Sequence, residues 1–425
     1  MRRFSGALSG LALLALVACS SGSDVSDRAL PSEVRIGLLV EEMSQTGQDA
    51  IHGAQLAADL INETLDLSLP LAAERGLPNL NGADVAIVTV DVTGDPGTAA
   101  GQVAMLASRH HPAGMVMVGS SELTAAASLR SDRLGLPFLD AYSGENYLTT
   151  RGLDWFFRLA PTDRMLGEEL FSLLRSQELA GVPTRRLVLV YADDSLSQTT
   201  AATIEDLAAE GGFSVVDELP IDTDNSDEES GDDDAEFDTL SDQIEDVNAD
   251  VVIAVSHDQR VANAIVRSLN PAESSLPIIA LGRGFTVQDP ISDADRLLCV
   301  RAWSTEFASR HPAAREVTEQ YTALFNSRMT EAAAGAFTAV LTLAAAIDRA
   351  GSTEPEEIRS ALQSIQFSGT QTIMPWEGIR FASSGQNTDA AGVVEQVIGG
   401  RLSMVYPTEI SHTHVVWPAT DGGDS

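Results

Sequence analysis

The sequence lacks lysine altogether and contains only two cysteines among its 425 residues. All 26 basic residues are therefore arginines, and they face 62 aspartates and glutamates, which gives a formal net charge of −36 at pH 7. A field of this sign repels phosphate backbones and argues against nucleic acid as a partner. A chain without lysine cannot form a GxxxxGK[ST] phosphate-binding loop, and two cysteines are too few for a disulfide framework or a cysteine-rich zinc site.

The usual motifs of catalysis are missing as well. The sequence has no GxSxG nucleophile elbow and no HExxH metal motif. The glycines on either side of Arg283 lack the third glycine of a dinucleotide-binding fingerprint. We therefore expect a protein that is not an enzyme and that requires neither a cofactor nor a metal ion.

The first residues have the pattern of an export signal. A short basic start precedes an apolar core, Leu11–Ala18, that is too short to span a bilayer. The run Leu16-Val17-Ala18-Cys19 resembles a bacterial lipobox, in which the cysteine becomes the first residue and carries lipid. This pattern predicts a lipoprotein signal peptide over 1–18, a lipid on Cys19 and a polar tether over 19–33. The alternative is an ordinary secretory signal with a chance cysteine.

Short apolar runs alternate with amphipathic segments along the rest of the chain. Helical spacing of apolar residues lies between the runs, as in Gly47–Leu65, and no later stretch approaches 18 consecutive apolar residues. The expected strands are Val34–Val40, Asp84–Val92, Gly114–Val118 and Pro137–Ala141, and after Ala160 Arg186–Tyr191, Phe213–Leu219, Asp250–Val255 and Pro277–Leu281. This alternation predicts an α/β fold with two doubly wound parallel-sheet lobes in tandem.

Two further segments stand out. The segment 222–238 carries ten carboxylates in seventeen residues, and we read it as a solvated acidic loop insertion. The alternative is a calcium-binding loop of the EF-hand type that starts at Asp222. Such a loop needs glycine at its sixth position and glutamate at its twelfth, but this segment has Asp227 and Asp233 there. Glu331–Ala350 is an alanine-rich helix that ends at a glycine. Cys299 lies between the apolar residues Leu298 and Val300 of an expected strand, Leu297–Trp303, and is expected to be a buried free thiol.

A series of short motifs resembles one known family in its order along the chain. The motifs are Val34-Arg35-Ile36-Gly37-Leu38-Leu39, Gly53-Ala54-Gln55-Leu56-Ala57, Gly119-Ser120-Ser121, Phe157-Arg158-Leu159-Ala160-Pro161-Thr162-Asp163 and Pro375-Trp376-Glu377-Gly378. In this order, the chain resembles the type I periplasmic binding proteins, and more narrowly the branched-chain amino acid (Leu/Ile/Val) binding subfamily of ABC transporter substrate-binding lipoproteins.

The resemblance implies two lobes joined by three hinge segments, near Ala160–Arg164, Gly282–Pro290 and Gln371–Gly378. The N-terminal lobe would comprise 34–160 and 286–372, the C-terminal lobe 161–285 and 373–408, and a tail 409–425. It also implies a monomer, in the periplasm or at the cell surface, held to the membrane by its N-terminal lipid. Such a protein closes on a small polar or anionic molecule and delivers it to an ABC permease. The alternative is a non-transport lipoprotein of the same fold, either an activator of penicillin-binding proteins or a ligand sensor for a membrane receptor.

The resemblance further assigns ligand-binding positions. Ser120 or Ser121 matches a serine that binds the carboxylate of the ligand, and Ser143 lies in the second binding loop. A position that packs an aromatic ring on the ligand falls on Thr46, and a tyrosine position of the second lobe falls near Asp258 or Gln259.

The acidic residue that pairs with the ammonium group of the ligand falls on Arg283. This reversal of charge predicts a ligand other than a plain branched-chain amino acid, because an unpaired buried charge is costly and a guanidinium suits an oxyanion. Alternatively, Arg283 turns away or pairs with an acid such as Asp258, or the alignment has slipped at this loop. A pair with Asp258 would leave a neutral site that suits an amide or a polyol.

Overall fold

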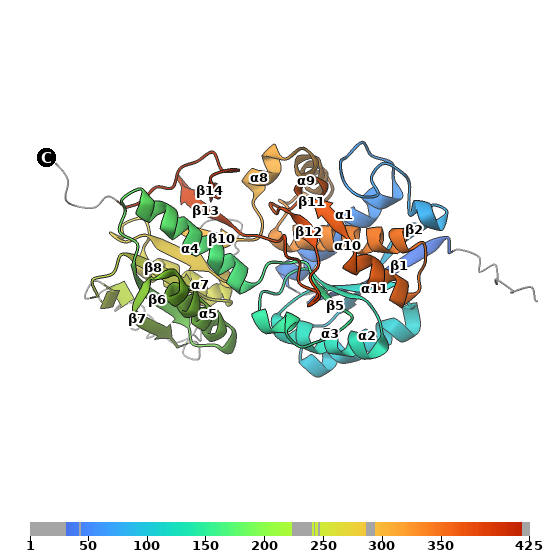
Figure 1. Ribbon diagram of the computed structural model, residues 1–425, viewed down its shortest axis with the longest axis horizontal. Coiled ribbons are helices and arrows are strands. Elements are labelled where there is room, and N and C mark those ends of the chain that lie inside the picture. Colours follow the sequence, from blue (N-terminus) through green and yellow to red (C-terminus); the bar gives the residue numbers. More distant parts are fainter. Residues whose placement is uncertain are drawn as a thin grey trace, which may run out of the picture. The chain divides into compact units, whose positions relative to one another are not determined.

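The computed structural model describes residues 31–41, 44–222, 240–241, 243–244, 247–285 and 294–418. The predicted export signal with Cys19, and the acidic segment apart from its first residue, lie outside these residues. The described residues form two α/β lobes, each built on its own sheet (Figure 1). The predicted fold class is confirmed.

The first lobe contains a parallel five-stranded sheet in the order β2-β1-β3-β4-β5. Its strands are β1 (Glu33–Val40), β2 (Asp84–Asp91), β3 (Gly114–Val118), β4 (Phe138–Asp140) and β5 (Phe156–Arg158). The first four match the expected strands closely, because both faces of this sheet are covered and its strands are mostly apolar. β5 was not predicted, since it has three residues and ends at an arginine.

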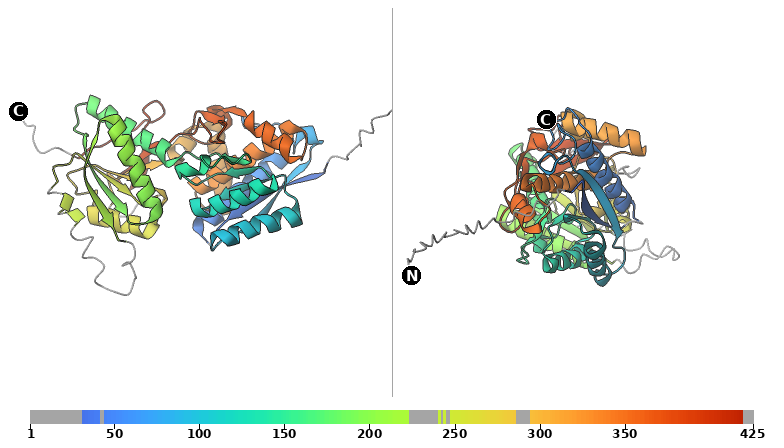
Figure 2. Two further views of the ribbon diagram at one scale, coloured as in Figure 1. Left: turned by 60° about the horizontal axis from the view of Figure 1, so that its bottom comes forward. Right: turned by 90° about the vertical axis from the view of Figure 1, so that its right-hand side faces the viewer.

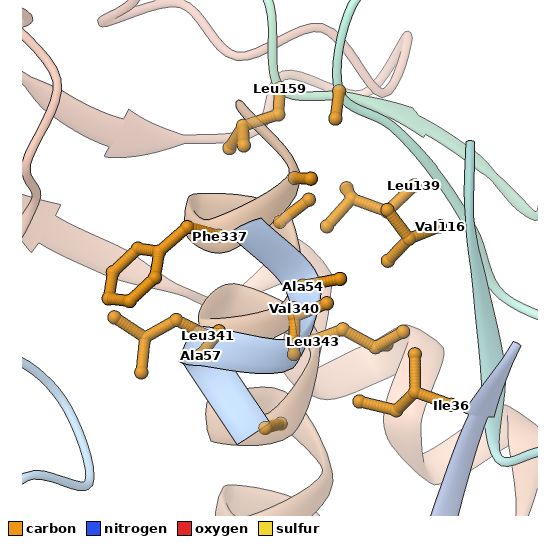
Figure 3. Packing of buried hydrophobic residues seen from close by; sticks show 14 of the residues in the cluster. Ile36, Ala54, Ala57, Val116, Leu139, Leu159, Phe337, Val340, Leu341 and Leu343 are labelled. Atoms are coloured by element: carbon orange, nitrogen blue, oxygen red, sulfur yellow. The ribbon is translucent and has the colours of Figure 1, made fainter. Parts of the chain in front are cut away.

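Helices cover both faces of this sheet, as Figure 2 shows. α1 (Gln45–Asn62) and α10 (Glu331–Ala350) lie on one face, whereas α2 (Pro96–His110) and α3 (Ser121–Leu134) lie on the other. The lobe also holds α9 (Pro312–Phe325) and α11 (Pro355–Gln363), which pack into the same core as α1 and α10, and the small sheet of β11 (Gln366–Ser368) and β12 (Gly378–Arg380). Figure 3 shows Ala54 and Ala57 of α1 beside Val340 and Leu341 of α10.

α10 combines the length and composition of a membrane span with a buried position. It is the candidate span among the described residues, and 89% of its apolar window is buried inside the structure. The small residues of both helices allow α1 to approach α10 closely. A Cβ built on Gly53 of α1 would lie only 2.1 Å from the carbonyl oxygen of Ala333 in α10. α10 is therefore the central helix of the first lobe's core.

The second lobe contains a seven-stranded sheet in the order β14-β13-β10-β9-β8-β6-β7. Its strands are β6 (Arg186–Ala192), β7 (Ser214–Ile221), β8 (Val251–Val255), β9 (Ile278–Leu281), β10 (Leu298–Arg301), β13 (Val393–Ile398) and β14 (Arg401–Tyr406). The five strands from β10 to β7 are parallel, and the hairpin of β13 and β14 is antiparallel. α4 (Asp163–Leu179) and α5 (Ser195–Gly211) cover one face, and α7 (Gln259–Leu269) the other.

Two of the expected lobe boundaries are wrong. We expected 286–372 to belong to the first lobe, but β10 pairs with β9 and β13 in the second sheet. The rest of this segment, from α8 (Thr305–Arg310) on, packs into the core of the first lobe. We expected 373–408 to belong to the second lobe, but β12 pairs with β11 of the first. The chain therefore crosses between the lobes at about Ala160–Thr162, just after Arg301, and shortly before Val393. A short apolar strand has the same pattern in either sheet, so only tertiary packing decides where it pairs.

Candidate functional site

A cavity of about 480 Å³ lies where the carboxyl ends of strands from both sheets meet. The first lobe contributes residues after β1, β3 and β4 and at the start of α10, and the second lobe contributes residues after β8 and β9 and at the start of α5. Its lining comprises Glu41, Ser44, Gln45, Thr46, Asp49, Val118, Gly119, Ser120, Ser121, Tyr142, Ser143, Gly144, Leu196, His257, Gln259, Arg283, Gly284, Ser327, Thr330, Glu331 and Ala332. We call this cavity the cleft pocket.

Three helices of the first lobe begin at the cleft pocket. Ser44 caps α1 by accepting from the N–H of Gly47 at 2.9 Å, and Thr330 caps α10 by accepting from that of Ala333 at 3.2 Å. Ser120 caps α3 in the same way, with the longer distance of 3.4 Å. The N-terminal end of a helix carries partial positive charge and N–H groups without partners in the helix. The first lobe therefore presents donors suited to an oxygen atom of a ligand.

The structure brings five of the six sequence-predicted residues to the cleft pocket: Thr46, Ser120, Ser121, Ser143 and Arg283. Asp258 is not among its lining residues, although the residues on either side of it, His257 and Gln259, are. Asp258 is exposed and its carboxylate caps α7, accepting from the N–H groups of Arg260 at 2.8 Å and Val261 at 3.0 Å. An aspartate just before a helix serves as an N-cap, which explains its position outside the pocket.

The loop after β4 is fixed by a buried carboxylate. The backbone N–H groups of Tyr142 and Ser143 both donate to Oδ1 of Asp140 at 3.1 Å, and the Ser143 hydroxyl donates to Oδ2. Burial raises the pKa of Asp140, while Arg158 opposes that rise. The loop is thereby held with Ser143 facing the cleft pocket.

Arg283 spans the pocket from the second lobe to the first. It begins the short 3-10 helix η3 (Arg283–Phe285) after β9. Its guanidinium forms an ion pair with Glu331 at the start of α10, donates to the carbonyl oxygen of Tyr142, and lies 4.4 Å from the centre of the Tyr142 ring. The pairing that we considered with Asp258 is wrong, because the carboxylate of Asp258 caps α7 and that of Glu331 meets Arg283.

A half-buried histidine, His257, positions the backbone of Arg283. The N–H of Arg283 lies 3.4 Å from Nδ1 of His257, and Nε2 of His257 lies 2.9 Å from the Thr200 hydroxyl. A backbone N–H can only donate, so Nδ1 accepts and the proton of the neutral ring is on Nε2. Thr200 then donates to Asp163 at the start of α4, at 3.2 Å. Burial lowers the pKa of His257, which favours this neutral form.

The pocket holds more acids than bases. Glu41, Asp49 and Glu331 face the single arginine, Arg283. Asp49 is buried and accepts from the Gln45 side chain at 2.8 Å, and its burial raises its pKa. Among the residues that the structure describes, no three histidine, cysteine or acidic side chains are placed to hold a metal ion. The arrangement suits reversible binding of a small polar molecule.

Sequence reasoning missed Glu331, His257 and Asp49 at this site. Glu331 lies in the first turn of α10, where acids commonly favour the helix dipole, and Asp49 lies one turn into α1, so nothing in the sequence marks them as pocket residues. His257 was detectable by position, because it lies in the loop that follows the apolar strand β8.

Comparisons with known proteins agree with this architecture. A Leu/Ile/Val-binding protein homolog of Brucella abortus is 24% identical over 96% of this chain and 96% of its own. An ABC transporter substrate-binding protein of Desulfitobacterium hafniense in complex with Leu superposes with a TM-score of 0.70 at 20% identity, over 88% of this chain and 99% of that one. A branched-chain amino acid transporter substrate binding protein of Streptococcus pneumoniae in complex with isoleucine gives a TM-score of 0.67 at 19% identity, over 91% and 100%.

The sequence profile of one family covers most of the chain. It matches residues 33–401, from β1 into β14. This range includes the first sheet, the second sheet up to the start of β14, and every residue of the cleft pocket. The chain belongs to the periplasmic binding protein family.

Proposed function

We propose that this chain is an extracytoplasmic solute-binding protein that closes on a small polar ligand and delivers it to an ABC permease of the branched-chain amino acid type. The observation that carries the proposal is the cleft pocket, whose walls come from two lobes. The relatives reported above are named as Leu/Ile/Val-binding proteins or as substrate-binding proteins of ABC transporters. The protein would bind without chemical change to the ligand, as a monomer.

Closure by hinge bending follows from the way in which the lobes are connected. The chain crosses between the sheets at three places, so a rotation about these segments would move the two walls of the pocket together. The closed form is then what a permease could distinguish from the open form. Thr46, Ser120, Ser121, Ser143 and Arg283 are the side chains that we expect to meet the ligand or its immediate surroundings.

Attachment through Cys19 belongs to the same proposal. Mass spectrometry of the membrane fraction should show an acylated N-terminal peptide that begins at Cys19. An intact Met1, or a soluble form cleaved elsewhere, would contradict a lipid anchor.

A thermal-shift screen of the purified protein against a library of polar metabolites tests the binding function. A ligand that binds only the folded protein stabilises it and so raises the melting temperature. At a concentration 100 times the Kd, this stabilisation is about 2.7 kcal/mol. We expect one chemically related group of compounds to give such a shift. A library without a single hit would favour a non-transport role for this fold over solute binding.

A further inference from the structure

Arg283 and Glu331 form a largely buried ion pair inside the cleft pocket. Their side chains are 14% and 10% exposed, and they belong to different lobes. Oε2 of Glu331 also accepts from the backbone N–H of Ala302 at 3.1 Å, while Oε1 faces the guanidinium of Arg283. Arg283 also has the carbonyl oxygen and the ring of Tyr142. Each charge of the pair is therefore satisfied by the protein itself.

This pairing bears directly on the charge of a ligand. Glu331 is the pocket acid that a ligand's ammonium group would use if Arg283 were absent. With Arg283 in place, an incoming ammonium would have to displace the guanidinium and would lie beside a second buried cation. Removing one partner of a buried pair leaves an uncompensated charge, which is strongly unfavourable.

The other two pocket acids are poorer acceptors. Asp49 is buried and its carboxylate already accepts from the amide of Gln45, so it is less available to a ligand's ammonium group. Glu41 is half-buried and close to Gly119, where its Oε2 lies 3.6 Å from a Cβ built on that glycine. Glu41 is therefore the one rival site for an ammonium group that the experiment must control.

We propose that the Arg283–Glu331 pair selects against ligands that carry an ammonium group, so that the cleft pocket binds a small oxygen-bearing solute without one. This inference rests on the proposed solute-binding function. Serine and threonine hydroxyls, the amides of Gln45 and Gln259 and the starts of α1, α3 and α10 supply donors for the oxygens of such a solute. Arg283 and Glu331 are specificity-determining residues in this account.

Leucine and its 2-oxo acid, 4-methyl-2-oxopentanoate, form a matched pair of probes. Leucine carries an ammonium group on the carbon at which the 2-oxo acid carries a ketone oxygen, and both have the same carboxylate and side chain. Calorimetric titration of the wild type should show the 2-oxo acid binding at least about tenfold more tightly than leucine, and tenfold corresponds to about 1.4 kcal/mol. Arg283→Gln releases Glu331, so leucine should gain at least about tenfold, and leucine should also raise the melting temperature of this variant.

Further variants assign the effect to the pair. In the double variant Arg283→Gln with Glu331→Gln, the increase in leucine affinity should be abolished. In the double variant Arg283→Gln with Glu41→Gln, that increase should remain. Arg267→Gln, on the exposed side of α7, is the matched control and should behave as wild type. If Arg283→Gln does not fold, Glu331→Gln alone should raise the affinity for the 2-oxo acid and not that for leucine.

Two results would overturn the inference: tighter binding of leucine than of the 2-oxo acid by the wild type, or an unchanged leucine affinity in Arg283→Gln. The metabolite screen separates this failure from that of the proposed function. A hit that carries an ammonium group contradicts only the selection by Arg283 and Glu331. A screen without hits, with no leucine gain in Arg283→Gln, contradicts solute binding as well.

Discussion

The contact between α1 and α10 predicts opposite effects for one substitution at two helical glycines. Gly53 of α1 is buried, and an added Cβ would lie 2.1 Å from the carbonyl oxygen and 2.8 Å from the Cα of Ala333. Because these atoms are backbone, the helices must separate. We take a cost near the upper end of overpacking, about 3 kcal/mol, against a gain of about 1 kcal/mol in helix propensity. Gly53→Ala should therefore lower the free energy of unfolding by about 2 kcal/mol.

Gly101 of α2 provides the matched control. It is exposed, and nothing lies within 4 Å of a Cβ built on it. Gly101→Ala should stabilise the protein by up to about 1 kcal/mol, so the two variants should differ by about 3 kcal/mol. Urea unfolding followed by tryptophan fluorescence measures this difference. Equal stability of the two variants would refute the close packing of α1 on α10, on which the positions of Thr46 and Glu331 depend.

Three further predictions concern buried polar groups. Burial, with repulsion from Asp163, raises the pKa of Glu145 to about 7 from its ordinary 4.5, so the folded chain holds this proton more tightly than the unfolded chain. The protonated Glu145 side chain therefore contributes its full stability below pH 4.5, and this contribution is lost as the pH rises to about 7. In urea unfolding, Glu145→Gln should have a higher free energy of unfolding than the wild type at pH 8 and the same free energy at pH 4. Arg158 is fully buried and donates to Gln386 at 2.7 Å, so Arg158→Met should cost about 3–5 kcal/mol of unfolding free energy; wild-type stability would contradict this. Cys299 is a free buried thiol whose pKa burial raises to about 11, so a thiol reagent at pH 8 should label it only in denaturant.

The parts of the fold that the sequence predicted are those in which one physical signal dominates. β1 was expected over Val34–Val40 and is observed over Glu33–Val40, because a strand covered on both faces is a continuous apolar run. The buried thiol of Cys299 followed from the same signal and is confirmed. β5 was missed because its arginine, Arg158, suggests exposure, whereas the structure buries it completely.

The candidate site was predictable in position but not in its pairings. Loops after parallel strands converge at one edge of a sheet, which places Ser120 and Ser143 near one another from topology alone. The partner of Arg283 was not predictable, because Glu331 begins a helix in the other lobe and only the packing of the two lobes brings the charges together. The same packing assigns β10 and β12 to sheets that periodicity could not identify.

Binding of a small solute in the cleft pocket is tested most directly by calorimetry on the wild type and on a variant with a filled pocket. Thr46 lines the pocket in the first turn of α1, and Thr46→Trp would occupy part of its roughly 480 Å³. Thr322→Trp, at an exposed position of α9, adds the same side chain away from the pocket. With the compound that gives the largest thermal shift, the wild type and Thr322→Trp should bind equally, and Thr46→Trp should lose at least about a hundredfold in affinity, or about 2.7 kcal/mol. Full binding by a folded Thr46→Trp variant would contradict the assignment of this cavity as the ligand site.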